Sequence, residues 1–323
     1  MSYCSDEAEI AGEPLPGTAP RNRSWIVIEQ DGSYGEHALT ESRLPIAVGQ
    51  RIDAAKAGSG TGVLLARRPE FRSDQGATSR RVWLSSCGPG ATRMRVAQLD
   101  DIEALPRLDL ARIGNGELPG LGRISHEPAL FICTNGRRDT CCALKGRALV
   151  AGMLGRDDDR PDDDREVQNH IWESSHQGGH RFAPVAVLLP YGYVYGRLTP
   201  TTAREVILAA GRGELALNGL RGRSSLPRTA QAAEIIVRRS YSLHGAEDLD
   251  VLGRNSDGRV QGFSHKADIG PPLLQVRHVD GRAWNVETRL EPVRPRTPIS
   301  CQEPPSERTA VRIARLEPTE PWC

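Results

Sequence analysis

The chain has 323 residues, enough for two or three domains, and its 26% charged and 38% hydrophobic residues are ordinary for a globular protein. Its 42 Lys and Arg nearly balance its 41 Asp and Glu, which leaves no overall field to attract nucleic acid or an anionic membrane. Residues 1–20 lack the basic start and apolar run of a signal peptide. No later segment has the length and hydrophobicity of a membrane-spanning helix, so we expect a cytoplasmic protein.

The N-terminal part of the chain is predicted to be an α/β unit, which we place at residues 1–112. Apolar patterning there predicts a strand, an amphipathic helix and two further strands, over residues 25–29, 47–57, 63–66 and 81–85. The Pro- and Gly-rich residues 12–21 are expected to be extended. Residues 100–127 are expected to form a connector with one short helix.

A second α/β unit is predicted at residues 113–212. Its patterning indicates a strand, a helix, three strands and a helix, over residues 129–133, 142–154, 167–172, 185–189, 193–195 and 200–210. Thr199 is a suitable N-cap for the last helix, and the acidic run at residues 157–166 is typical of a solvated loop. This order of elements suggests a thioredoxin-like sandwich.

A β-rich extension is predicted at residues 213–323. Its patterning indicates a helix and then two strands, over residues 230–243, 273–278 and 282–290. The two strands flank an Asp280-Gly281 turn, which is a strong hairpin signal. No recognisable chemistry falls in this unit, and the fold class predicted for the whole chain is α/β.

Two short clusters of metal-binding side chains stand out in the second unit. Cys133 ends the first predicted strand there, and Cys141 and Cys142 begin the following helix. His176 and His180 lie four residues apart around a pair of glycines. Thiolate and neutral imidazole suit iron or zinc, and two short segments that each supply two ligands can close a four-ligand site. The seven cysteines are odd in number and scattered, so a disulfide framework is not expected.

The spacing of the cysteines bears on the kind of metal. A zinc knuckle prefers cysteines about two to four residues apart, whereas Cys133 and Cys142 have eight residues between them, so zinc fits less well. A 2Fe-2S cluster is wider and accepts two Cys and two His, the ligand set of Rieske centres. Each Rieske loop pairs one Cys with one His, whereas here the cysteines share one loop and the histidines the other, which excludes that class.

The sequence at these clusters resembles the sucrase/ferredoxin-like proteins, which carry a thioredoxin-like ferredoxin domain. The resemblance lies in residues 133–149 (CTNGRRDTCCALKGRAL), in residues 173–200 (ESSHQGGHRFAPVAVLLPYGYVYGRLTP) and more loosely in residues 12–30. It covers most of residues 12–210. Family members with this His pair are taken to bind a 2Fe-2S cluster through Cys and His.

The resemblance implies a 2Fe-2S cluster held by Cys133, Cys142, His176 and His180. Cys141 remains the alternative for the second thiolate, because adjacent side chains point in different directions. Two thiolates and two neutral imidazoles would leave the oxidised site without net charge, so we expect easier reduction, coupled to protonation of an imidazole. We therefore expect an electron-transfer protein, a redox carrier or redox subunit more than a stand-alone enzyme, whose partners are unidentified electron donor and acceptor proteins.

Sucrase activity is not expected. A glycosidase needs two carboxylates facing each other across a sugar, and this chain has 5% aromatic residues and no recognisable acid pair. Two other classes remain open. One is a metal-free thiol-disulfide oxidoreductase that uses Cys133 with Cys141 or Cys142, although no cysteine pair here has the Cys-x-x-Cys spacing. The other is a binding module with a structural zinc.

Overall fold

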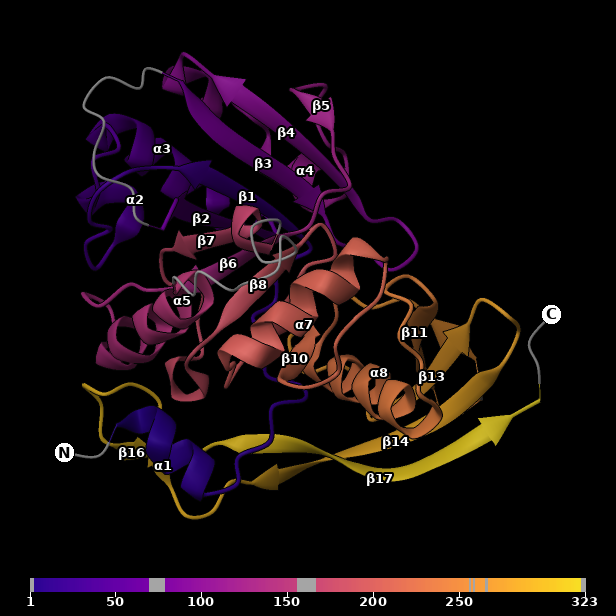
Figure 1. Cartoon of the computed structure of the whole chain (residues 1–323). Helices are drawn as coiled ribbons and strands as arrows, with labels where there is room; N and C mark the ends of the chain where they lie inside the picture. Colours follow the sequence, from indigo (N-terminus) through magenta and orange to yellow (C-terminus); the bar gives the residue numbers. More distant parts are fainter. Residues whose placement is uncertain are drawn as a thin grey trace.

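The computed structural model describes residues 3–69, 79–155, 167–255, 257, 259–264 and 267–320. It is a mixed α/β structure with a ten-stranded sheet, a five-stranded sheet and helices packed against them (Figure 1). The predicted fold class, α/β with a β-rich C-terminal region, is confirmed. The acidic run predicted to be a loop, residues 157–166, lies outside the described residues. Within the described ranges, none of the helices is long and apolar enough to cross a membrane.

The first half of the large sheet follows the predicted N-terminal pattern and adds two strands to it. Its elements are β1 (Ser24–Glu29), α2 (Ala38–Glu41), α3 (Ile46–Lys56), β2 (Thr61–Arg67), β3 (Arg80–Ser86), β4 (Arg93–Leu99), the 3-10 helix η1 (Ile102–Arg107), α4 (Leu110–Gly114) and β5 (Arg123–Ile124). The added strands are β4 and β5. The predicted connector at residues 100–127 contains β5 and two short helices, where one helix was expected. β1 pairs in parallel with β2 and antiparallel with β3, which pairs antiparallel with β4. The strand β4 is not predicted from the sequence, because Arg93, Arg95 and Gln98 interrupt its apolar pattern.

The second half of the large sheet has the predicted order of strand, helix, three strands and helix. Its elements are β6 (Ala129–Cys133), the π-helical turn η2 (Cys142–Gly146), α5 (Arg147–Leu154), β7 (Ile171–Ser174), the 3-10 turn η3 (His180–Phe182), β8 (Ala186–Leu189), β9 (Tyr193–Tyr195), α7 (Pro200–Gly211) and β10 (Leu220–Arg223). β6 pairs in parallel with β7 and antiparallel with β8, which pairs antiparallel with β9. Thr199 caps α7 with its side chain, as predicted.

The two halves have the same topology and join edge to edge. β2 pairs antiparallel with β7, where Ala66 lies opposite Ser174, and the sheet order is β10-β9-β8-β6-β7-β2-β1-β3-β4-β5. Aromatic packing crosses the junction, because the Trp83 and Trp172 rings lie edge to face with centroids 4.6 Å apart. The two halves therefore share one continuous sheet. The domain boundaries near residues 112 and 212 remain predictions.

The C-terminal region forms the second sheet. Its elements are α8 (Arg228–Tyr241), β11 (Leu249–Arg254), β12 (Val260–Gln261), β13 (Leu273–His278), β14 (Ala283–Pro292), β15 (Thr297–Pro298), β16 (Pro305–Ser306) and β17 (Thr309–Thr319). The predicted helix and hairpin are confirmed. β14 and β17 form a long ribbon whose far end carries β15 and β16 beside the N-terminal helix α1 (Cys4–Ile10) (Figure 1). Segments from both ends of the chain therefore meet.

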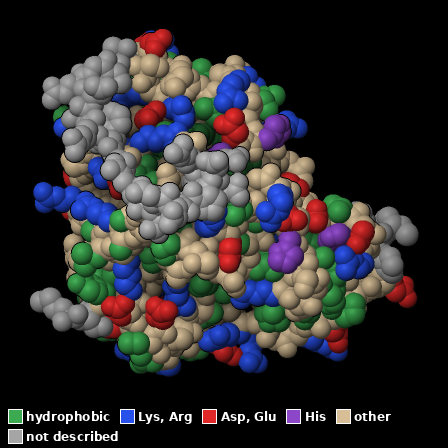
Figure 2. All heavy atoms as spheres, viewed as in Figure 1, with side chains coloured by type: hydrophobic (Ala, Val, Ile, Leu, Met, Phe, Trp, Pro, Cys, Tyr) green, Lys and Arg blue, Asp and Glu red, His purple; other side chains and the backbone are tan. Residues whose placement is uncertain are grey.

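The surface carries charges of both signs. Basic and acidic side chains are interspersed with apolar ones over the face seen in Figure 2. Exposed pairs such as Arg112 with Glu117, 2.6 Å apart, place opposite charges side by side. Side chains of both charge signs therefore lie on this face.

Candidate metal centre

The cysteine half of the candidate site is built by the junction of β6 with η2. Cys133 is the last residue of β6 and Cys142 the first of η2, and both side chains are fully buried. A Cβ on Gly146 would lie 2.1 Å from the Cys133 carbonyl oxygen, so only glycine lets this turn approach the strand so closely. The π-helical turn is a feature often found at functional sites. The local sequence therefore brings the start of the helix against the end of the strand.

The histidine half of the site comes from the loop after β7. Gly178 and Gly179 have φ of +84° and +82°, and a Cβ on Gly179 would lie 2.3 Å from an Arg221 nitrogen. The Gly178 N–H donates a hydrogen bond of 3.1 Å to His176 Nε2. The rings of His176 and His180 stack with centroids 4.1 Å apart. The glycine pair thus folds the loop so that both imidazoles lie together.

The two halves converge. One ligand atom each from Cys133, Cys142 and His176 lie within 4.8 Å of one another. His180 is next to this group, with its Nδ1 3.9 Å from Cys142 Sγ. The structure thus brings all four residues of the predicted ligand set into one neighbourhood, and three of them into a single close group. The Cys141 side chain lies in a different group of thiols.

The electrostatics of the site favour the ligating forms of Cys133 and His180. A hydrogen bond from Cys142 lowers the pKa of Cys133 well below its usual value, and the interaction with the His176 ring lowers it further. The hydrogen bond between the two thiols raises the pKa of Cys142. Cys133 is therefore the first thiolate of the pair. Burial lowers the pKa of His180 to about 4, so its ring is neutral at physiological pH. Thiolate and neutral imidazole are the forms that bind metals.

The residues fit a metal. His176 Nδ1 is buried and has no hydrogen-bond partner among the described residues, which is costly unless something else satisfies it. The surrounding donors are thiol sulfur and imidazole nitrogen, the set suited to zinc and iron. These Cys and His side chains could therefore hold a metal ion or cluster.

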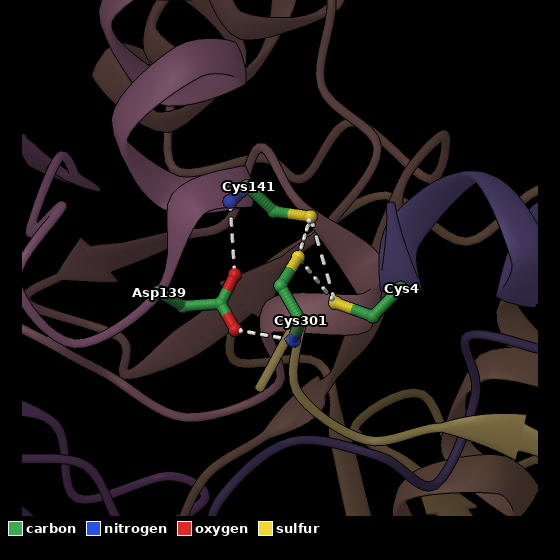
Figure 3. A group of neighbouring side chains, drawn as sticks. All are labelled: Cys4, Asp139, Cys141 and Cys301. Atoms are coloured by element: carbon green, nitrogen blue, oxygen red, sulfur yellow. Dashed lines mark hydrogen bonds between the residues drawn. The ribbon is translucent and has the colours of Figure 1, made fainter. Parts of the chain in front are cut away.

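A second thiol group, which is not predicted from the sequence, lies beside the first. Cys4, Asp139, Cys141 and Cys301 also place ligand atoms within 4.8 Å of one another (Figure 3). A hydrogen bond from Cys4 is the main cause that lowers the pKa of Cys141 to about 6. The sequence holds no short motif for this group, because Cys4 and Cys301 lie 137 and 160 residues from Cys141.

The fold and the donor set define an α/β protein with a Cys/His group able to hold a metal. The chain belongs to the sucrase/ferredoxin-like family, whose model matches residues 15–222. No curated protein and no solved structure matches the chain. The matched residues include both halves of the large sheet and the predicted ligands, whereas Cys4 and Cys301 lie outside them.

Proposed function

We propose that the protein is an electron-transfer protein that holds a 2Fe-2S cluster through Cys133, Cys142, His176 and His180. The observation that carries the proposal is the convergence of two buried thiols and an imidazole within 4.8 Å, with a second imidazole stacked on the first. Family membership supports it, because these residues fall in the matched segment. A bound cluster would supply exchange of one electron at a time.

The residues around the site have distinct tasks in this proposal. Phe182 and Val185 pack in one buried apolar cluster with Cys133 and Cys142, and so keep water from the thiol side. His176 is partly exposed, whereas both cysteines are fully buried. The exchange of electrons with donor and acceptor proteins is therefore expected on the histidine side. Neither partner protein is identified.

Asp139 lies beside one of the two histidines, His180. Its Oδ2 lies 3.7 Å from His180 Nδ1, and its carboxylate is buried. Burial by itself would raise the pKa of Asp139, but the hydrogen bonds it accepts, with the His180 ring, lower the pKa below its usual value. Asp139 is therefore an ionised group that acts on the His180 ring through its charge, at a distance longer than a hydrogen bond.

We expect the protein purified without oxygen to be red-brown and to contain iron and acid-labile sulfide in equal amounts, about two of each per fully loaded chain. Visible absorption and elemental analysis measure this on one sample. A folded, colourless protein with zinc bound at Cys133 and Cys142 would contradict the proposal, because zinc has no redox chemistry.

Proton uptake is the finer part of the proposal. With two thiolates and two neutral imidazoles the oxidised site would have no net charge. Above the pKa at which a bound imidazole loses its outer N–H proton, reduction would return that proton to His176 or His180. The reduction potential should therefore fall as pH rises through the imidazole pKa of the oxidised form, at about 59 mV per pH unit for one proton per electron. Potentiometric titration with the cluster intact measures this, and a potential constant across the alkaline range would exclude both histidines as titrating ligands.

A further inference from the structure

Three cysteines from distant parts of the chain meet beside the predicted cluster site. Cys4 lies at the start of α1, Cys141 precedes η2, and Cys301 lies in the turn between β15 and β16 (Figure 3). The Sγ atoms form a triangle with sides of 3.5 Å from Cys4 to Cys141, 3.1 Å from Cys141 to Cys301 and 3.6 Å from Cys301 to Cys4. Cys4 and Cys141 are fully buried and Cys301 is partly exposed.

One carboxylate holds this triangle together. Asp139 Oδ1 accepts a hydrogen bond of 2.9 Å from the Cys141 N–H, and Oδ2 accepts bonds of 2.9 Å from the Cys301 N–H and from Ser300 Oγ. The Ser5 hydroxyl donates to Cys141 Sγ at 3.2 Å. Two of the three cysteines are therefore positioned through their own backbones by the same buried acid.

We propose that Cys4, Cys141 and Cys301 bind a structural zinc ion, with a carboxylate oxygen of Asp139 as the fourth ligand. A tetrahedral zinc with Zn–S bonds of about 2.3 Å separates its sulfurs by about 3.8 Å, close to the sides of this triangle. A disulfide would use two of the thiols and leave the third. Copper(I) prefers purely soft ligands, whereas zinc accepts thiolate together with carboxylate, so the mixed donor set favours zinc.

The site joins the segment matched by the family model to parts of the chain outside it. Cys4 and Cys301 lie before and after the matched residues 15–222, and Asp139 and Cys141 lie within them. The zinc would therefore tie both terminal segments to the second half of the sheet. Its structural role is distinct from the proposed electron transfer, although Asp139 lies beside both sites.

The terminal segments need such a tie. α1 has only seven residues, and within the described chain no side chain caps its N-terminus. β15 and β16 have two residues each. Elements this short are not stable alone, and metal binding supplies folding free energy because an unfolded chain lacks the preformed site.

The test uses the full chain with both first-site thiolates replaced, Cys133→Ser and Cys142→Ser together. This variant is titrated with Co²⁺, and the charge-transfer absorption of thiolate bound to cobalt is measured. Such absorption can arise only from the cysteines that remain. We expect one tetrahedral Co²⁺ per chain, displaced by one Zn²⁺. Adding Cys301→Ser should weaken Zn²⁺ binding by more than about tenfold, since loss of even an outer partner of a metal ligand costs that much.

A matched control and a second measurement complete the test. Cys87→Ser in the same background removes a buried thiol that contacts Ser85 and Pro190 and should leave Zn²⁺ binding unchanged. The wild-type protein should contain one zinc per chain in addition to any iron. A sample that binds neither Co²⁺ nor Zn²⁺ through thiolate, or that carries a Cys141–Cys301 disulfide when purified under reducing conditions, overturns the proposal. Iron analysis on the same samples separates this result from failure of the first site.

Discussion

The two halves of the large sheet have the same strand order and pairing directions, yet only one of them ends its first strand in a proposed metal ligand. In the second half Cys133 pairs with Ser174, and the next residue, Thr134, donates its N–H to the Ser174 carbonyl at 3.1 Å. In the first half Glu29 pairs with Ala66, and the N–H of Gln30 donates to the Ala66 carbonyl at 2.7 Å. The backbone at the two strand ends is therefore equivalent.

The difference lies in the segment after each strand. The second half continues into a turn where Gly146 allows close packing on the strand and Cys142 adds a second thiol. In the first half the chain passes through α2 to α3, whose start contains neither Cys nor His. The topology thus supplies a position at the strand end, while the chemistry depends on a few side chains and glycines.

The largest expected effect comes from replacing the thiols of the first site. Cys133→Ser and Cys142→Ser should each lose most of the iron and sulfide, because a hydroxyl is a poor substitute for a thiolate ligand. Glu29→Ser, at the equivalent position in the first half, should retain them. Iron and sulfide analysis after anaerobic purification measures all three variants.

Cysteines outside the first site provide the control. Cys4→Ser, Cys141→Ser and Cys323→Ser should keep the iron, although Cys323 lies outside the described residues. Loss of colour in Cys141→Ser but not in Cys142→Ser would move the assignment of the second thiolate by one position. The result therefore decides between the two adjacent cysteines.

Most elements in this comparison could be predicted from the sequence, but the repeated topology of the two sheet halves could not. Short continuous apolar runs predict β1, β2 and β3, and the Cys and His spacing predicts the first site. The repeat needs β4, whose arginines hide its apolar face. The second thiol group combines Cys4, Cys141 and Cys301 only through tertiary packing, so no local pattern can indicate it. A sequence pattern does not contain the contacts between distant segments.

A smaller effect should show that the two halves unfold together. Leu65 in β2 is fully buried, and its carbonyl accepts a hydrogen bond of 2.8 Å from the Ser175 N–H in the second half. Leu65→Ala should cost about 2–5 kcal/mol in the free energy of unfolding, because it leaves a cavity. Urea unfolding followed by circular dichroism and by visible absorption should shift to lower urea in one common transition.

Leu208→Ala on α7 is the control for this shift. The Leu208 side chain is 39% exposed, so its removal should change the free energy of unfolding by no more than about 0.5 kcal/mol. Two separate transitions in Leu65→Ala, with the cluster lost only in the second, would mean that the halves are independent in spite of their shared sheet.

The smallest effect concerns pH and is expected in protein freed of its cluster. Burial lowers the pKa of His180 to about 4 from the ordinary value of about 6.5, so the unfolded chain binds the proton first. The stability that the neutral ring contributes is complete above about pH 6.5 and is lost as pH falls towards 4, up to about 3 kcal/mol. Urea unfolding across this range measures the loss.

Two substitutions isolate the contribution of His180 to the pH dependence. His180→Asn should flatten the pH dependence between 4 and 6.5, since the titrating ring is gone. His37→Asn, an exposed histidine in the first half, should leave it unchanged. Equal slopes in the wild type and in His180→Asn would show that another group titrates there.

The pairing of β2 with β7 also covers an edge of the second half of the sheet. Without the first half, β7 would be the open edge of the sheet β10-β9-β8-β6-β7, with unpaired backbone groups next to the buried Phe131 and Trp172. Such an edge is a template for adding strands from another molecule. In the intact chain that position is filled by β2, and the edges of the sheet are then the two-residue β5 and the short, irregular β10. The half without the proposed metal ligands thus occupies a sheet edge that the second half alone would leave unpaired.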